Sequence, residues 1–389
     1  MAKVLLVDTN FSAAPLRRAL LELGHEVHLC GANPNDALAR HAKNYHVTDY
    51  ADVEALVELA EALCVDHVIP GCNDRAYLSC ATAKALTGHC RFNGVDLLEQ
   101  ASVLLDKQLF RDCARALNLT TPQTYSPGAC VPSGPVIVKP VDAFSGLGVE
   151  VIAQPNQDKL DCAVQKAKSS SASGGALVED WIGGQLYSHS AFVKDQKILQ
   201  AHVVVEHCVA NPYAVDTSHL AQGALPVDAL QALEGELEIL ARHLQLCDGL
   251  LHTQFIWDGQ RCWLIELTRR CPGDLYSQLV ELTVGPGYVM QYLLPFLGLP
   301  LEVVAGQVES NPILRHTLTL PEACTLESLR FNVPLLIERW VPVATVGDSI
   351  GVAPKGRIAI LFARVGSGDE LLSLSQRAKS RILFSVNAL

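Results

Sequence analysis

The first 95 residues alternate short apolar runs with segments of helical spacing, and this alternation limits the fold more than any other feature of the chain. Residues 3–8, 26–31 and 66–72 predict buried strands, and helical patterns separate and follow them. Strands that alternate with helices in this way form a parallel sheet with helices on its faces. We therefore expect an N-terminal α/β domain over residues 1–95. The first strand is not followed by G-x-G-x-x-G, so the dinucleotide-binding fingerprint is missing.

Beyond this domain the pattern changes from alternation to longer elements. A helix is predicted over residues 96–119, and the Pro/Gly/Ser-rich loop after it marks a subdomain boundary. Residues 227–246 have the spacing of an amphipathic helix. Residues 249–267 predict a β-hairpin that turns at Trp257, Asp258 and Gly259.

Charge and cysteine content exclude several classes of function. The 389 residues carry a formal net charge of −11, which argues against binding to nucleic acid because phosphates require a basic face. The 13 cysteines include no C-x-x-C pair, so we expect reduced thiols in a cytoplasmic protein. Residues 287–306 are the best candidate for a membrane span, but Gln291, Pro295, Pro300 and Glu302 interrupt them. They predict a buried helix and a turn instead.

An apolar strand that ends in Lys139 precedes a short Gly/Ser stretch. Burying an unpaired ammonium group is costly, so Lys139 requires an anionic partner. Ser145, Gly146 and Gly148 allow several backbone N–H groups to point toward one position. A lysine beside such amides predicts a phosphate site. The alternative is a hairpin turn with a lysine that reaches solvent.

Glu266 lies within an apolar strand, and Gln254 lies opposite it in the predicted hairpin. Carboxylate and amide oxygens on one face of a sheet are suitable ligands for Mg²⁺, which also keeps waters and substrate phosphates. Arg269 and Arg270 add positive charge beside these residues. The alternative is a structural Glu–Arg ion pair.

A third segment, residues 176–189, joins an apolar strand that contains Glu179 to a glycine pair and another strand. A hinge of this kind exposes backbone N–H and C=O groups beside an apolar wall, which suits the edge of a purine. The alternative is an ordinary loop between strands.

The order of these parts resembles the ATP-grasp superfamily over about residues 1–300. Lys107 in the linker helix, Lys139 and its Gly loop, the Glu179 hinge and the Glu266 hairpin follow one another as in that superfamily. The resemblance implies a chain of mixed α/β and α+β structure with the ATP-grasp fold.

The resemblance also implies the division of the chain after the parallel α/β domain. An ATP-grasp domain would span residues 96–310, with a mobile lid subdomain at about 120–185. Residues 311–389, where strand patterns dominate, would form a small β-rich C-terminal region.

The implied ATP-binding set comes from three separate segments and comprises Lys107, Lys139, Ser145, Gly146, Gly148, Glu179, Trp181 and Ile182. Within it, Lys139 would contact the α- and β-phosphates. Glu179 would accept a hydrogen bond from the adenine amino group, beside the apolar side chains of Trp181 and Ile182.

The implied metal ligands are Gln254, Glu266 and Thr268, which would hold Mg²⁺ or Mn²⁺. Arg270, together with Lys139, would stabilise the transferred phosphoryl group. Two of these ligands depart from the usual pattern, because Thr268 stands in place of an amide and Gln254 in place of an acid.

A third departure concerns the ribose. Leu186 stands where a glutamate often follows the hinge, and we predict His189 as its substitute. For the second substrate we predict contacts from His207, Tyr213 and Asp274, the last of which would order Arg270 or meet an amine. The alternative for the residues near His207 is a solvent-facing strand.

The implied activity is an ATP-dependent ligase. ATP would convert a small carboxylate into an acyl phosphate, and an amine would then displace phosphate, with ADP and phosphate released. Two alternatives remain open: a carboxylase of the biotin-dependent type, and a catalytically weakened nucleotide-binding protein. The expected partners are small molecules, not nucleic acids or membranes, and the apolar first domain is compatible with a homodimer.

Overall fold

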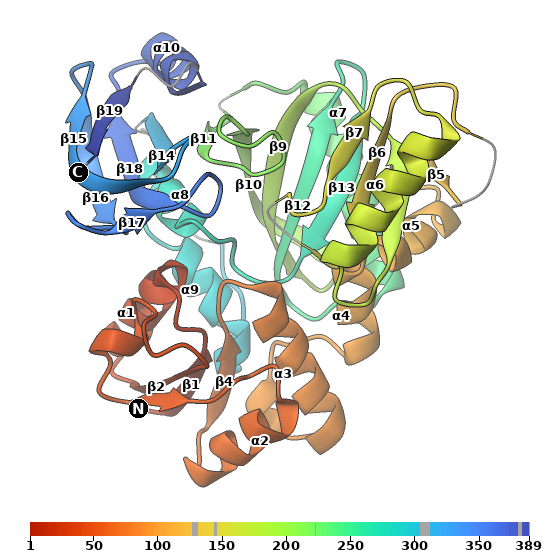
Figure 1. The fold of residues 1–389 in the computed structure, drawn as a ribbon. Helices are drawn as coiled ribbons and strands as arrows, with labels where there is room; N and C mark the ends of the chain where they lie inside the picture. Colours follow the sequence, from red (N-terminus) through yellow and green to blue (C-terminus); the bar gives the residue numbers. More distant parts are fainter. Residues whose placement is uncertain (127–130, 144–145, 222, 304–311, 380–382, 389) are drawn as a thin grey trace.

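Four sheets organise the chain, as Figure 1 shows. The computed structural model describes residues 1–126, 131–143, 146–221, 223–303, 312–379 and 383–388. A mixed architecture of parallel and antiparallel sheets with covering helices confirms the predicted fold class.

The N-terminal sheet has the strand order β3-β2-β1-β4, and all its pairs are parallel. The central strand β1 is covered on both faces, so its residues 4–7 are fully buried, as the continuous apolar run predicted. The elements of this part are β1 (Lys3–Val7), η1 (Phe11–Ala13), α1 (Ala14–Glu22), β2 (Glu26–Gly31), η2 (Ala39–His41), β3 (Tyr45–Val47), α2 (Val53–Ala62), β4 (His67–Pro70), α3 (Asp74–Thr87) and η3 (Cys90–Phe92).

The single helix predicted over residues 96–119 is in fact two helices, α4 (Leu98–Leu105) and α5 (Lys107–Ala116). Asp106 has extended backbone angles, and its carboxylate accepts hydrogen bonds from the N–H groups of Gln108 and Leu109. It therefore ends one helix and caps the next. Lys107 becomes the first residue of α5.

A smaller antiparallel sheet, of order β5-β8-β6-β7, lies within the segment predicted as the lid. One helix, α6, packs on it and buries the apolar side chains of both layers (Figure 1). The elements are β5 (Thr124–Tyr125), β6 (Val136–Pro140), β7 (Glu150–Ile152), α6 (Gln157–Ser170) and β8 (Ala176–Asp180).

The largest sheet has eight strands in the order β13-β12-β9-β10-β11-β14-β18-β16. Leucines of α7 pack on one face, and tyrosines of α8 and α9 contact the other. Its first strands and helices are β9 (Gln185–Lys194), β10 (Lys197–His207), β11 (Thr217–Leu220), α7 (Val227–His243), β12 (Gly249–Trp257), β13 (Cys262–Thr268), α8 (Tyr276–Val284), α9 (Tyr288–Leu293) and η4 (Pro295–Leu297).

The C-terminal region is rich in strands, as predicted, but it shares the large sheet with the preceding part of the chain. Strand β14 pairs with β11 through Thr217–His316 and Ser218–Arg315. The remaining elements are β14 (Ile313–Thr319), β15 (Cys324–Phe331), β16 (Leu336–Pro342), β17 (Ser349–Ile350), β18 (Arg357–Arg364), α10 (Gly368–Lys379) and β19 (Phe384–Ala388).

The buried helix predicted within residues 287–306 is confirmed, because α9 is short and buried and the turn η4 follows it. No helix in the described part of the chain is long and apolar enough to cross a membrane. Each cysteine in the described ranges is a free thiol.

A buried ion pair joins the N-terminal part to the large sheet. Asp96 accepts hydrogen bonds from Arg269 Nε at 2.7 Å, Tyr77 Oη at 2.7 Å and Cys247 N at 2.9 Å. Burial alone would raise the pKa of Asp96, but the charge of Arg269 and the hydrogen bonds from Tyr77 and Cys247 together outweigh burial, and the pKa is lowered. Asp96 therefore stabilises the fold in its ionised form, and this contribution is lost as the pH falls through the lowered pKa.

We expect Asp96→Ala to lower the free energy of unfolding by about 3–5 kcal/mol, because Arg269 would remain buried without its partner. Urea unfolding followed by circular dichroism measures this. Glu22→Ala, which removes an exposed contact to Arg18, is the control and should change the value by less than about 1 kcal/mol. Equal losses in the two variants would contradict the prediction.

Candidate functional site

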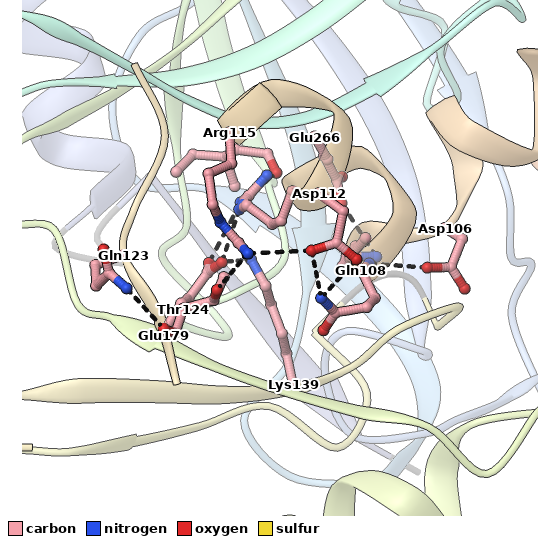
Figure 2. A network of polar contacts seen from close by, with 12 residues as sticks. Asp106, Gln108, Asp112, Arg115, Gln123, Thr124, Lys139, Glu179 and Glu266 are labelled. Atoms are coloured by element: carbon pink, nitrogen blue, oxygen red, sulfur yellow. Dashed lines mark hydrogen bonds and ion pairs between the residues drawn. The ribbon is translucent and has the colours of Figure 1, made fainter. Parts of the chain in front are cut away.

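Lys139 lies near the end of β6 with only 5% of its surface exposed, and its ammonium group forms an ion pair with Glu179 on β8. Arg111 of α5 donates from Nε to the same carboxylate at 2.9 Å. Figure 2 shows Lys139 pointing toward Glu179 from the neighbouring strand. The anionic partner that burial required for Lys139 is therefore Glu179.

Burial is the largest influence on Lys139 and lowers its pKa to about 8, although the charge of Glu179 opposes this shift. For Glu179, burial would raise the pKa, but Lys139 and Arg111 outweigh it and the pKa is lowered. The carboxylate is thus ionised and engaged by two cations. The adenine contact stays a prediction for Glu179, whose observed role is to hold Lys139.

Lys107 brings a second ammonium group to the same place. Its Nζ donates to the carbonyl of Ala143 at 2.9 Å and lies 3.4 Å from Glu266 Oε2. Its backbone N–H also donates to Val141 just after β6. The structure therefore brings together residues from α5, the lid sheet and β13, as the phosphate-site hypothesis requires.

The glycines of the loop after β6 adopt conformations that other residues rarely take. Gly146 and Gly148 have φ values of +71° and +72°. A Cβ at Gly146 would lie 2.6 Å from Tyr213 Cβ, and one at Gly148 would lie 2.7 Å from Ser170 Cβ. Both positions therefore require glycine, and Tyr213, predicted for the second substrate, packs against this loop. Ser145 lies outside the described residues.

The hinge follows β8 and presents apolar surface. Trp181 is 47% exposed, Ile182 is half-buried, and the N–H of Trp181 donates to Pro135 at 3.0 Å. Gly184 has φ +149°, and a Cβ there would collide with the carbonyl of Trp257. An exposed tryptophan beside a half-buried isoleucine is compatible with the predicted purine wall.

Gln254 and Glu266 are paired directly across β12 and β13, so their side chains share one face. Thr268 donates its hydroxyl proton to Asp74 Oδ1 at 2.7 Å, and its oxygen also accepts from the Arg270 N–H at 3.4 Å, which leaves one lone pair. In the described ranges no three His, Cys, Asp or Glu side chains form a metal cluster. These oxygen donors fit Mg²⁺ that completes its shell with water and phosphate.

Glu206, a residue that sequence analysis missed, lies beside this metal set. Its Oε2 accepts a hydrogen bond of 2.7 Å from Gln254 Nε2, and only 4% of its surface is exposed. It comes from β10, two strands away from β12 in the sheet. A lone glutamate in a strand that ends near residue 207 carries no sequence signal for this pairing.

Arg270 is ordered by Asp74, not by Asp274 as predicted. Its Nε and Nη2 donate to Asp74 Oδ1 and Oδ2 at 2.9 and 3.0 Å. Asp274 instead lies 2.6 Å from Arg357 Nη1 and 4.0 Å from Arg315 Nη1. Asp74 starts α3 at the carboxyl edge of the parallel sheet, which is the edge where such sheets bind ligands. This position in the predicted strand–helix order was the sequence signal that could have identified Asp74.

Two predicted residues lie away from the set. His189 is fully buried beneath α7, 3.1 Å from Glu234 Oε1, on the face opposite Gln254, so it is not placed to contact a ribose there. His207 follows Glu206 in β10 and therefore points to the other face. Burial lowers the pKa of His207 to about 3, which keeps its ring neutral.

Comparison with known sequences agrees with this geometry. The pattern of the ATP-grasp domain matches residues 133–278. A phosphoribosylamine–glycine ligase from Thermococcus gammatolerans is 23% identical over 91% of this chain and 90% of its own length. Another from Pyrococcus furiosus is 25% identical over 69% of this chain and 66% of its own length.

Solved structures show the same fold along the whole chain. An L-amino acid ligase from Bacillus licheniformis has a TM-score of 0.81 at 16% identity and covers 100% of this chain and 99% of its own. A phosphoribosylglycinamide synthetase from Anaerococcus prevotii has a TM-score of 0.76 at 16% identity, with 100% of both chains covered. The biotin carboxylase domain of the Hydrogenobacter thermophilus 2-oxoglutarate carboxylase has a TM-score of 0.75 at 14% identity, with 100% and 91% covered.

The lowered pKa of Lys139 predicts a pH effect on ATP affinity. Below pH 8 the free protein holds a charged Lys139, and above pH 8 the neutral form dominates. Because the phosphates bind the charged form, we expect affinity to fall about tenfold from pH 7 to pH 9. Isothermal titration with ATP measures this. Lys139→Met should bind ATP weakly at both pH 7 and pH 9. A wild-type ATP affinity that is the same at both pH values would contradict the assignment of Lys139 to the phosphate site.

Proposed function

We propose that this chain, whose residues 133–278 match the ATP-grasp domain and whose fold is that of solved ligases, is an ATP-dependent ligase that activates a small carboxylate as an acyl phosphate and couples it to an amine. The observation that carries the proposal is the convergence of Lys107, Lys139 and Glu266 from separate elements beside a loop that requires glycine. Such a group of cations, amides and oxygen donors suits a triphosphate.

In this proposal the chain acts mainly by positioning and by neutralising charge. Lys139 and Lys107 hold the phosphates, and Arg270, fixed in two places by Asp74, faces the negative charge of the transferred group. Mg²⁺, when bound by Glu266 and Gln254, would neutralise phosphate charge. The hinge and the lid sheet would exclude water, which protects the acyl phosphate from hydrolysis.

The acid substrate is proposed to lie near Asp274. Two arginines, Arg315 and Arg357, lie beside this carboxylate, and a guanidinium group suits a carboxylate ligand. Tyr213, packed against Gly146, would line the same region from the other side of the phosphate loop.

The names of the sequence relatives support carbon–nitrogen bond formation, and the free thiols support a cytoplasmic location. A structural neighbour described as a dimer supports a homodimer as the assembly to test.

A phosphate-release screen tests the function. Amino acids and other small carboxylates are combined pairwise with amines, ATP and Mg²⁺, and ADP is measured alongside. Release that requires an amine supports the ligase. Release that requires biotin and bicarbonate would support a carboxylase, and ATP binding without ADP formation would support a weakened nucleotide-binding protein.

We expect Lys139→Ala to lower phosphate release by at least about 100-fold with the fold intact, since the ammonium group faces the developing charge. The rate of the screened reaction and the circular dichroism spectrum are measured together. Lys166→Ala is the matched control, because Lys166 is an exposed lysine of the same subdomain that pairs with Glu150. Full activity of Lys139→Ala would remove Lys139 from the site.

Glu266→Gln should lower Mg²⁺-dependent activity by about 100-fold, because it removes the only charged ligand among the three predicted ones. Activity is measured over a range of Mg²⁺ concentrations. Glu150→Gln, an exposed change in the lid sheet, should behave as wild type. An unaltered Mg²⁺ dependence in Glu266→Gln would exclude Glu266 as a ligand.

A further inference from the structure

Glu206 is a buried acidic residue of β10, and its side chain contacts Gln254 of β12. It accepts a hydrogen bond from Gln254 Nε2 at 2.7 Å. With 4% of its surface exposed, Glu206 has little contact with water.

This contact decides which way the Gln254 amide faces. In the structure the amide turns its NH₂ group toward Glu206, with Gln254 Nε2 as the donor and Glu206 Oε2 as the acceptor. The amide oxygen is then the branch that remains for another ligand. Since Gln254 lies directly opposite Glu266, this oxygen and the Glu266 carboxylate belong to the same face of the hairpin.

We propose that Glu206 is a positioning residue for the divalent metal, which acts through Gln254 by fixing the amide with its oxygen toward the ion. The inference rests on the proposed function in one respect, namely that a metal–nucleotide complex binds beside Glu266.

The physical reason is that a neutral amide is a weak ligand unless it is oriented. A free glutamine side chain rotates between two similar orientations and would spend part of its time with NH₂ toward the cation. The contact with Glu206 engages Nε2 and so leaves the amide oxygen as the atom available to the ion. Such contacts behind a metal ligand typically change metal affinity 10- to 100-fold.

The test is a cycle of four proteins: wild type, Glu206→Gln, Gln254→Glu and the double variant that exchanges the two residues. Binding of Mn²⁺ to each protein in the presence of saturating ADP is measured by electron paramagnetic resonance. ADP binding in EDTA and the thermal unfolding midpoint are measured for the same proteins. These readouts need no turnover.

We expect Glu206→Gln to weaken Mn²⁺ binding 10- to 100-fold while ADP binding in EDTA and the unfolding midpoint stay near wild type. Gln254→Glu alone places its new carboxyl group against that of Glu206, where the 2.7 Å hydrogen bond was, and should lower the unfolding midpoint. In the exchanged protein the new glutamine donates to the new glutamate, so Mn²⁺ affinity should return to the wild-type value or exceed it.

Three results would overturn the inference: wild-type Mn²⁺ affinity in Glu206→Gln, an equal loss of ADP binding in EDTA, or no recovery in the exchanged protein. Absence of Mn²⁺ binding to the wild-type complex would also overturn it. Normal Mn²⁺ binding together with no amine-dependent phosphate release would contradict only the proposed function, so the two failures are distinguishable.

Discussion

The site depends on one buried charge and on what it takes to keep that charge inside the protein. Lys139 is held by Glu179, and Glu179 is held in turn by Arg111, whose Nη2 also donates to the carbonyl of Ile265 at 2.8 Å. The group therefore joins the lid sheet, α5 and β13. Because each charge left alone in the interior would be costly, the three elements constrain one another's positions. That constraint places Lys139, the lysine proposed to bind the phosphates.

A second constraint acts immediately after β13 of the hairpin. The consecutive residues Arg269 and Arg270 follow β13, and each binds an aspartate of the N-terminal part, Asp96 and Asp74 respectively. One pair is fully buried and the other is partly exposed. The buried pair, Arg269 with Asp96, anchors the parallel α/β layer. The partly exposed pair, Arg270 with Asp74, leaves Arg270 accessible where the chemistry is proposed.

Much of this could be predicted from sequence because it follows from local pattern or from the cost of burial. The period of the apolar residues predicted the parallel sheet and the hairpin, and the hairpin register placed Gln254 opposite Glu266. The break at Asp106 was missed because the apolar spacing continues across a capping residue. Glu206, Asp74 and the face occupied by His189 could not be predicted, since they depend on which distant strands become neighbours.

The pairing of β11 with β14 has a consequence for how the chain can be divided. The large sheet continues from the hairpin into the C-terminal region. A truncation near residue 310 would therefore leave this sheet without some of its strands. A fragment ending there would present the bare N–H and C=O groups of β11 to other molecules, and such an open margin invites strands from neighbouring copies to add on. By pairing with β11, strand β14 thus also covers this edge of the large sheet against such additions.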